Sequence, residues 1–217
     1  MRLALFDLDG TVLRGNSWQL YFWWLVRRRP VQAPGLLARL VLRAAGAGSG
    51  RALREAALRP WRGADTTELA AVGRQMLDER LRAEVRPVAR REIARAIADG
   101  CEPVLATAAF DFLAEAVARE LGVREVVCTR LEFAEGKFAG RIAGPELRGE
   151  AKAAAVRTRF AWRDVDWAAS RAFSDDAEDG PLFTLVGEAV FIARGAMRPA
   201  GLPANVRAVD WDALVSG

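Results

Sequence analysis

Histidine is absent from the 217 residues of this chain, and its absence excludes several kinds of active site. Ser-His-Asp triads, Cys-His pairs, histidine-ligated zinc sites and acid/base catalysis by imidazole all need this residue. Any catalysis by this chain therefore depends on carboxylates, hydroxyls, lysine, arginine or thiols.

Cysteines and long apolar runs are also scarce. The only cysteines, Cys101 and Cys128, are far apart and form no CxxC pair, so the sequence predicts neither a disulfide framework nor a zinc site. No uncharged apolar run approaches the ~18 residues that a membrane span needs. The apolar start contains Asp7 and Asp9, so we expect no signal peptide. These features predict a cytoplasmic protein.

Lysine is missing from residues 14–98, where 17 arginines accompany seven acidic residues, whereas the rest of the chain is acidic overall. This change in composition indicates a domain boundary. We expect a helical domain at residues 14–98, inserted into an α/β core domain that residues 1–13 and 99–217 form.

The inserted segment is expected to be helical throughout, and the rest to alternate between strands and helices. The predicted helices of the insertion cover 18–29 (with Ser17 as the cap), 34–45, 51–58, 66–82 and 87–98. After Gly100 we expect strands at 103–106, 124–129, 171–174 and 188–193, a hairpin of 131–133 with 137–140, and helices at 111–121 and from near Lys152 to about Phe160. This alternation predicts an α/β fold with a mainly parallel sheet.

The segment from Leu3 to Val12 carries the strongest functional signal. Its apolar residues form a predicted buried strand that ends at Asp7 and Asp9. Two carboxylates at this spacing repel each other, and a divalent cation is their natural partner. Taken alone, the segment is equally compatible with a solvated acidic turn after an edge strand.

Polar groups that complement these carboxylates follow other predicted strands. Thr107 comes after strand 103–106, and the amides of Ala108 and Ala109 behind it are suited to hold a phosphate. Lys152 supplies a positive charge for a phosphoryl group. Because ligands gather at the carboxyl ends of parallel strands, we expect these residues to meet there.

A second acidic cluster, with Asp175 and Asp179, follows strand 171–174. If this strand neighbours the first, both clusters reach one hard cation, and Mg²⁺ suits carboxylate ligands together with phosphate. One of the two aspartates would ligate the ion, and the other would orient a water molecule or Lys152. Without histidine, a carboxylate serves as nucleophile through an aspartyl-phosphate, and a second carboxylate acts as acid and base.

The four motifs resemble those of the haloacid dehalogenase superfamily of phosphatases, in the same order. They are Asp7-Leu8-Asp9-Gly10-Thr11, Thr107, Lys152 and Ser174-Asp175-Asp176-Ala177-Glu178-Asp179. The helical insertion resembles the cap of the subgroup that includes phosphoserine phosphatases. The resemblance implies a Rossmann-like, mainly parallel sheet with an inserted α-helical cap, and hydrolysis of phosphate monoesters.

The resemblance also implies a role for each motif residue. Asp7 corresponds to the nucleophile and Asp9 to the general acid/base. Mg²⁺ would bind Asp7, the backbone carbonyl of Asp9, and Asp175. The remaining expectations are phosphate contacts for Gly10, Thr107, Ala108 and Lys152, and supporting roles for Thr11, Asp176 and Asp179, with Asp176 as a substitute ligand.

Asn16 and Trp18, just after the first motif, are expected to select the substrate. In phosphoserine phosphatases a glutamate nine residues after the nucleophile meets the substrate's ammonium, and Asn16 in its place disfavours an amino-acid phosphate. The Trp-rich helix and the Arg27–Pro30 stop resemble phosphatidylglycerophosphatase-type members, which favours a lipid phosphate and contact with an anionic membrane. The aromatic residues are equally suited to the core of the cap, and both interpretations remain open.

The sequence therefore predicts an Mg²⁺-dependent phosphatase that acts on a phosphorylated small molecule or lipid, with peripheral contact at the inner membrane surface. The alternatives are a small-metabolite phosphatase of the phosphoserine type, a phosphotransferase, and a non-catalytic membrane-associating module. No helix-turn-helix or strand with interleaved aromatic residues indicates nucleic-acid binding, so we expect no nucleic-acid partner.

Overall fold

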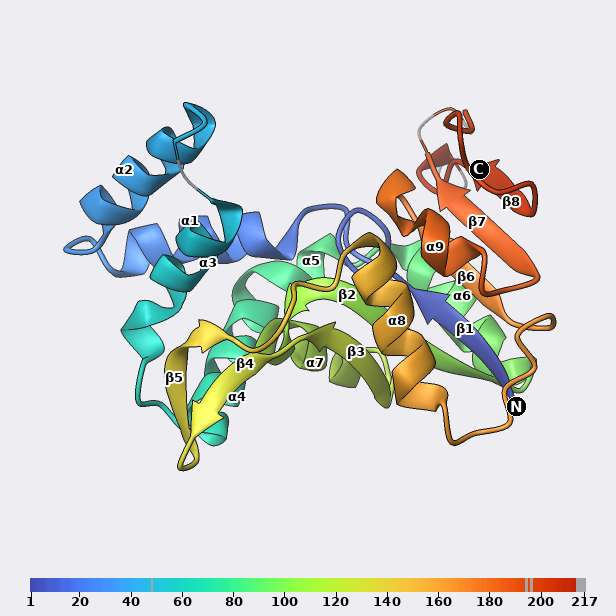
Figure 1. Ribbon diagram of the computed structural model, residues 1–217, viewed down its shortest axis with the longest axis horizontal. Coiled ribbons are helices and arrows are strands. Elements are labelled where there is room, and N and C mark those ends of the chain that lie inside the picture. The colour runs from blue at the N-terminus through green and yellow to red at the C-terminus, as the bar shows by residue number, and fades with distance from the viewer. Residues whose placement is uncertain (48, 194, 196, 214–217) are drawn as a thin grey trace.

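A computed structural model describes residues 1–47, 49–193, 195 and 197–213. At its centre lies a six-stranded sheet of strand order β3-β2-β1-β6-β7-β8, in which every neighbouring pair is parallel. The strands are β1 (Arg2–Phe6), β2 (Cys101–Phe110), β3 (Glu125–Thr129), β6 (Arg171–Ser174), β7 (Glu188–Ile192) and β8 (Val206–Val209). The sheet confirms the predicted Rossmann-like, mainly parallel α/β fold (Figure 1).

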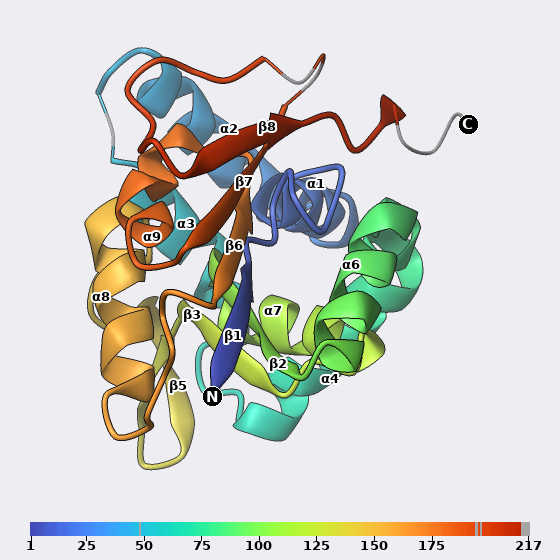
Figure 2. The same cartoon turned by 90° about the vertical axis from the view of Figure 1, so that its right-hand side faces the viewer.

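Helices cover both faces of this sheet. They are α1 (Ser17–Arg28), α2 (Ala33–Ala44), α3 (Gly50–Leu58), the 3₁₀ turn η1 (Arg59–Trp61), α4 (Thr66–Met76), the π turn η2 (Leu77–Leu81), α5 (Arg82–Glu84), α6 (Pro87–Ala98), α7 (Asp111–Glu120), α8 (Gly149–Phe160), the 3₁₀ turn η3 (Ala177–Asp179) and α9 (Gly180–Phe183). Figure 2 shows α8 and α9 on one side of the sheet, with α6 and α7 on the other.

Strand β1 occupies the middle of the sheet because both of its faces are apolar. Leu3 and Leu5 belong to a buried cluster that includes side chains of α8 and α9. Ala4 and Phe6 belong to a larger cluster with side chains of α7 and of the inserted helices, which include α6. Successive side chains of a strand point to opposite faces, so the apolar run Leu3–Phe6 fills both cores at once.

The inserted helices share the larger hydrophobic cluster with the sheet. Tyr21 of α1 packs edge-on against Phe110 of β2, with ring centroids 6.4 Å apart. Helix α4 packs against α7, and α6 packs against β2, while α1, α2 and α3 lie beyond the carboxyl end of β1 (Figure 1). The division of the chain at residues 14 and 98 stays a prediction.

The start of α1 differs from the prediction that Ser17 is its cap. Asn16 is the cap, because its backbone is extended (φ −104°, ψ 118°) and its Oδ1 accepts a hydrogen bond from the Gln19 N–H at 3.0 Å. Ser17 is the first helical residue, and its own N–H donates to Asp9 Oδ1 at 2.7 Å. The amide that begins α1 thus holds a carboxylate of the first motif.

Other elements also differ from the expected bounds. Strand β2 continues four residues beyond the predicted end, to Phe110. The predicted helix 66–82 is interrupted by the π turn η2, and β8 was not predicted. The expected hairpin is confirmed as the antiparallel pair β4 (Leu131–Ala134) and β5 (Lys137–Ile142). Within the described residues, the helices are too short or too polar to cross a membrane.

Candidate active site

The loop after β1 brings the first motif against the loop after β6. Gly10 has a φ of +78°, which favours glycine, and a Cβ at this position would lie 2.0 Å from Asp175 Oδ2. Thr11 Oγ1 donates to Asp175 Oδ1 at 3.2 Å and accepts from the Asp175 N–H at 2.9 Å. The two acidic motifs are thus in contact, as expected if their strands are neighbours.

Asp7 belongs to a buried cluster of charges with Lys152 and Asp179. Lys152 Nζ donates to Asp7 Oδ1 at 2.8 Å and to Asp179 Oδ2 at 2.7 Å, and its side chain is only 4% exposed. Ser174 Oγ also donates to Asp179 Oδ2, at 2.6 Å. Asp179 therefore positions Lys152 beside Asp7.

Burial and charge shift the pKa values of this cluster. Burial raises the pKa of Asp7 to about 7, with contributions from Asp179 and Asp9, although Lys152 acts in the opposite direction. Burial lowers the pKa of Lys152, but the charges of Asp7 and Asp179 outweigh it, so that this pKa lies above its usual value. Lys152 is therefore a fixed positive charge at the site.

Asp9 is held by the N-terminus of α1. Burial raises the pKa of the Asp9 carboxyl above its usual range, and the hydrogen bond from the Ser17 N–H partly counteracts this. A carboxyl with a raised pKa keeps its proton to a higher pH, which suits a general acid.

Thr107 lies in β2, where the register with β3 shifts between Thr107 and Phe110. Its Oγ1 accepts from the Ala109 N–H at 3.0 Å, so that this amide is not free, contrary to expectation. The carbonyl oxygen of Ala108 accepts from Thr129 Oγ1 at 3.0 Å and from Arg54 at 2.7 Å. These bonds fix the backbone beside Asp7.

A cavity of about 340 Å³ gathers most of the predicted site residues at the carboxyl ends of the strands. Its lining residues are Asp7, Asp9, Asn16, Thr107, Ala108, Arg148, Lys152, Asp175, Asp176 and Asp179. Asp176 also caps η3, because its Oδ1 accepts from the Glu178 N–H at 2.9 Å. We call this space the acidic cavity.

A second cavity, of about 570 Å³, adjoins the acidic cavity and shares Asn16 and Arg148 with it. Trp18, the other predicted specificity residue, lines this second space, which we call the aromatic cavity. Sequence reasoning missed Arg54, Glu146 and Arg148 at these cavities. Arg54 is one of many arginines in the insertion, and the other two lie next to the start of α8, so local sequence did not distinguish them.

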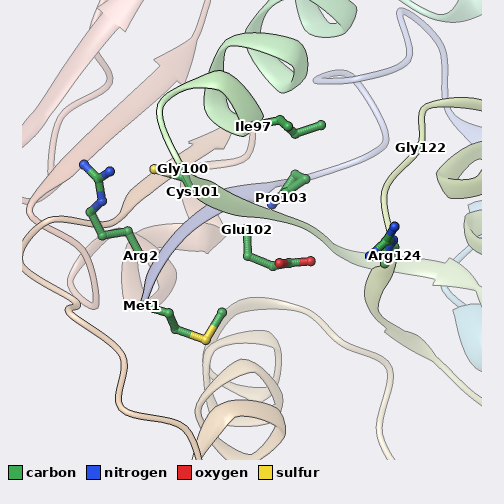
Figure 3. Close-up of a pocket in the computed structure, with 9 residues that line it drawn as sticks. All are labelled: Met1, Arg2, Ile97, Gly100, Cys101, Glu102, Pro103, Gly122 and Arg124. Atoms are coloured by element: carbon green, nitrogen blue, oxygen red, sulfur yellow. The ribbon is translucent and has the colours of Figure 1, made fainter.

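A cavity of about 430 Å³ lies elsewhere, where β1 and β2 begin (Figure 3). Arg2, Glu102 and Arg124 contribute its charged side chains. It contains none of the predicted site residues, and it lies at the amino ends of these strands. Ligands of parallel sheets gather at the opposite ends, which favours the acidic cavity as the functional site.

The acidic cavity fits a magnesium ion by the chemistry of its donors. Within the described residues, no group of three or more His, Cys, Asp or Glu side chains is arranged to hold a metal by itself. Mg²⁺ commonly keeps several waters and takes only one or two carboxylates besides phosphate oxygens. Asp7 and Asp175 line this cavity, and together with the backbone carbonyl of Asp9 they have the chemistry of such a donor set.

Comparisons with known proteins agree with this arrangement. A family model described as haloacid dehalogenase-like hydrolase matches residues 4–184. The chain is 31% identical over 196 residues to Phosphoserine phosphatase SerB1 of Mycobacterium tuberculosis, an alignment that covers 87% of this chain and 64% of that protein. The chain thus spans less than two thirds of the length of this relative.

Solved structures share the fold. The crystal structure of a protein of unknown function from Bordetella pertussis Tohama I has a TM-score of 0.76 and 26% identity, and the match covers 97% of this chain and 98% of that one. An unliganded probable phosphoserine phosphatase from Vibrio cholerae has a TM-score of 0.68 and 18% identity, with 96% of this chain and 60% of that one covered. The second likeness shows the fold alone.

Proposed function

Because this chain belongs to the haloacid dehalogenase-like hydrolase family, we propose that it is an Mg²⁺-dependent phosphatase that hydrolyses phosphate monoesters through an aspartyl-phosphate at Asp7. The observation that carries this proposal is the buried contact of Asp7 with Lys152 inside the acidic cavity. A nucleophilic carboxylate beside a fixed positive charge is suited to attack a phosphoryl group.

In the first step, a carboxylate oxygen of Asp7 forms a bond to phosphorus, and the bond from phosphorus to the ester oxygen breaks. Asp9 gives its proton to the departing alkoxide, and the raised pKa of Asp9 supports this role. In the second step, the Asp9 carboxylate takes a proton from water, whose oxygen bonds to phosphorus. The bond from phosphorus to Asp7 then breaks, which releases phosphate and restores both aspartates.

The remaining residues hold the phosphoryl group and the ion. Lys152 and the Thr107 hydroxyl supply a charge and a donor for phosphate oxygens, with the amide of Ala108 beside them. The Gly10 N–H, which was expected to contact phosphate, instead donates to the Gly15 carbonyl oxygen at 3.2 Å. Asp7, the Asp9 carbonyl and Asp175 would hold Mg²⁺, with Asp176 as a substitute ligand. When bound, Mg²⁺ neutralises the negative charge that the carboxylates and the phosphate bring together.

Replacement of the nucleophile tests this proposal. Asp7→Asn should abolish Mg²⁺-dependent hydrolysis of p-nitrophenyl phosphate, because an amide is a poor nucleophile. Asp78→Asn is the matched control, since Asp78 is 61% exposed on its side chain and pairs with Arg82 on the surface at 2.8 Å. Retained turnover in the Asp7→Asn protein would refute the mechanism.

We further propose that the substrate is a lipid phosphate, such as phosphatidylglycerophosphate, that is reached at an anionic membrane surface. Residues 14–54 include no acidic side chain but eight arginines. Helix α2, at the outer edge of the molecule (Figure 1), leaves Val41 66% and Leu42 52% exposed, and Trp23 of α1 is 49% exposed. Exposed apolar and aromatic side chains among arginines suit the headgroup region.

Vesicle sedimentation tests the membrane contact. We expect the protein to sediment with vesicles that contain phosphatidylglycerol, less so with pure phosphatidylcholine, and less at high salt. Leu42→Ser should weaken sedimentation, whereas Ile97→Ser, at a 50% exposed position on α6, should not. Equal binding by both variants, or none by the original protein, counts against a membrane surface.

A substrate screen separates the lipid from the alternatives. Faster hydrolysis of a small phosphorylated metabolite than of a lipid phosphate would favour a phosphoserine-type enzyme. Transfer of the phosphoryl group to an added alcohol in preference to water would indicate a phosphotransferase. Vesicle binding without any turnover would favour a non-catalytic module.

A further inference from the structure

The aromatic cavity lies where the alcohol portion of a phosphate monoester would extend from the acidic cavity. The two spaces share Asn16 and Arg148, and the aromatic cavity is the larger, at about 570 Å³ against about 340 Å³. Trp18, Phe22 and Leu53 contribute apolar surface to it. A leaving group bound there meets an apolar wall, together with the charged groups of Arg54, Glu146 and Arg148.

Arg54 connects the two cavities through its guanidinium. One nitrogen donates to the Ala108 carbonyl oxygen at 2.7 Å, and another donates to Glu146 Oε2 at 2.9 Å. The guanidinium lies 4.5 Å from the ring centroid of Phe110, and Arg54 is only 5% exposed. Arg54 is therefore held rigidly. It links Glu146 to the backbone of Ala108, which is a predicted phosphate-binding residue.

Glu146 presents an acceptor that its surroundings do not satisfy. Its Oε2 takes the hydrogen bond from Arg54 and lies 3.8 Å from Arg148 Nε. Its Oε1 is buried and has no hydrogen-bond partner among the described residues. A buried carboxylate oxygen without a donor costs free energy, so rotation of this carboxylate toward a donor on a ligand in the aromatic cavity, which Glu146 lines, would be favoured.

Asn16, which also lines the aromatic cavity, does not offer a comparable acceptor. The Asn16 Oδ1 is committed to the Gln19 N–H as the cap of α1. The carboxylate that lines the aromatic cavity thus comes from Glu146, which lies between β5 and α8 rather than in the insertion. Its neighbours Arg54 and Arg148 give the surroundings of Glu146 a balancing positive charge.

We propose that Glu146 is a specificity-determining residue whose carboxylate accepts a hydrogen bond from a hydroxyl or ammonium group on the alcohol portion of the substrate. Arg54 is the positioning residue that holds Glu146 in place. This inference rests on the proposed phosphatase function. The substrate class is a phosphate monoester of a polyhydroxy or amino alcohol, with room for an apolar continuation along Trp18 and Phe22.

Three substrates of similar size test this assignment: glycerol 3-phosphate carries hydroxyls, phosphoethanolamine carries an ammonium, and propyl phosphate has no donor. We expect kcat/KM to be at least about tenfold higher for one of the first two than for propyl phosphate, because a site built around a polar group rejects analogues that leave it unpaired. The preferred substrate of that pair tells which donor the site takes.

The informative variant is Glu146→Gln. The glutamine amide keeps one oxygen that can accept from Arg54, but its other group is an NH₂ donor and its negative charge is lost. This variant should reduce the preference over propyl phosphate to about threefold or less, chiefly through KM. Glu150→Gln is the matched control, because Glu150 is 68% exposed on its side chain and pairs with Arg157. It should keep the preference.

Two results would overturn the assignment. An equal loss on all three substrates in Glu146→Gln would mean that Glu146 acts only on structure, and no preference in the original protein would mean that no donor is recognised. Calorimetric binding of the three compounds to the Asp7→Asn protein separates this inference from the proposed function. Absence of turnover in the original protein contradicts the phosphatase proposal, whereas equal binding of all three compounds contradicts the role of Glu146.

Discussion

Lys152 is the residue on which the electrostatics of the site depend. Its ammonium lies between the carboxylates of Asp7 and Asp179, and all three side chains are at most 7% exposed. Removal of one partner from a buried ion pair leaves an uncompensated charge in a poorly solvated place. The same lysine is expected to hold phosphate, so that stability and activity are coupled at this position.

Lys152→Met should therefore lower the free energy of unfolding by about 3–5 kcal/mol at pH 8, where the two carboxyls are ionised in the unfolded chain. It should also abolish turnover. Lys137→Met is the control, since Lys137 is 56% exposed and pairs with Asp65 at 3.4 Å on the surface. Urea unfolding of both variants measures the change in the free energy of unfolding. Similar losses of stability in the two variants would show that burial of the ion pair does not determine its contribution.

Gly10 is constrained twice, by its positive φ and by the contact with Asp175. Gly10→Ala should cost about 1–2 kcal/mol of stability through its backbone conformation and should also displace Asp175. Gly122→Ala is matched in backbone, with a φ of +70°, but its Cβ meets nothing within 4 Å. Only Gly10→Ala should raise the Mg²⁺ concentration for half-maximal activity, by about tenfold or more. An equal Mg²⁺ requirement in both variants would argue against Asp175 as a ligand.

Asp7 and Asp175 could be predicted because each directly follows a strand, where local sequence is informative. Thr107 lies inside β2, where the register with β3 shifts, and the structure brings all three residues to one cavity. Arg54 and Glu146 could not be predicted in this way. They lie 92 positions apart in the sequence, and only the packing of α3 against the loop before α8 brings them into contact.

At the scale of elements, the helix α1 connects the first motif to the insertion. Its cap, Asn16, lies beside both cavities, so its side chain is available for a structural role and for substrate selection. These two roles respond differently to substitution. Aspartate caps helices as well as asparagine does, whereas alanine does not.

Asn16→Ala should lower the free energy of unfolding by about 1 kcal/mol, and Asn16→Asp should restore it. The aspartate adds a negative charge between the two cavities, so Asn16→Asp should reduce kcat/KM for anionic phosphate esters. Urea unfolding and steady-state kinetics measure the two effects separately. If stability falls equally in both variants, the cap contributes little; if kinetics are unchanged in Asn16→Asp, Asn16 does not face the substrate.

Elements with clear local boundaries were predicted well. Helix α6 has the predicted bounds, because Pro87 begins it and Gly100 follows its end with a φ of +73°. The π turn η2 was not predicted: its buried residues Leu77 and Leu81 are spaced as in an ordinary helix. Strand β8 is only four residues long and lies beside β7 at the end of the described sheet, so its sequence pattern is weak.

At the scale of the whole molecule, alternation of strands and helices predicted a parallel sheet but not the strand order. The proximity of the two acidic motifs requires that β1 and β6 be neighbours, and Phe6 pairs with Phe173 in that register. Their rings also stack, with centroids 4.6 Å apart. Strand order depends on contacts between residues far apart in the sequence, which periodicity does not reveal.

The shared hydrophobic cluster leads to a prediction for the complete chain. Because side chains of α1, α4 and the sheet belong to one cluster, we expect the insertion and the sheet to unfold together. Urea transitions followed by tryptophan fluorescence and by far-ultraviolet circular dichroism should coincide. Two separated transitions would show that the insertion forms a core of its own.

The central claim is that Asp7 carries the phosphoryl group during turnover. The most direct test is rapid acid quenching of the protein during hydrolysis of p-nitrophenyl phosphate with Mg²⁺, followed by mass spectrometry of its peptides. We predict a phosphoryl group on Asp7 that is absent from the Asp7→Asn protein and accumulates in Asp9→Asn, where the base that activates water is lost. A phosphoryl group on another residue, or continued turnover with none on Asp7 in the original protein or in Asp9→Asn, would contradict the account.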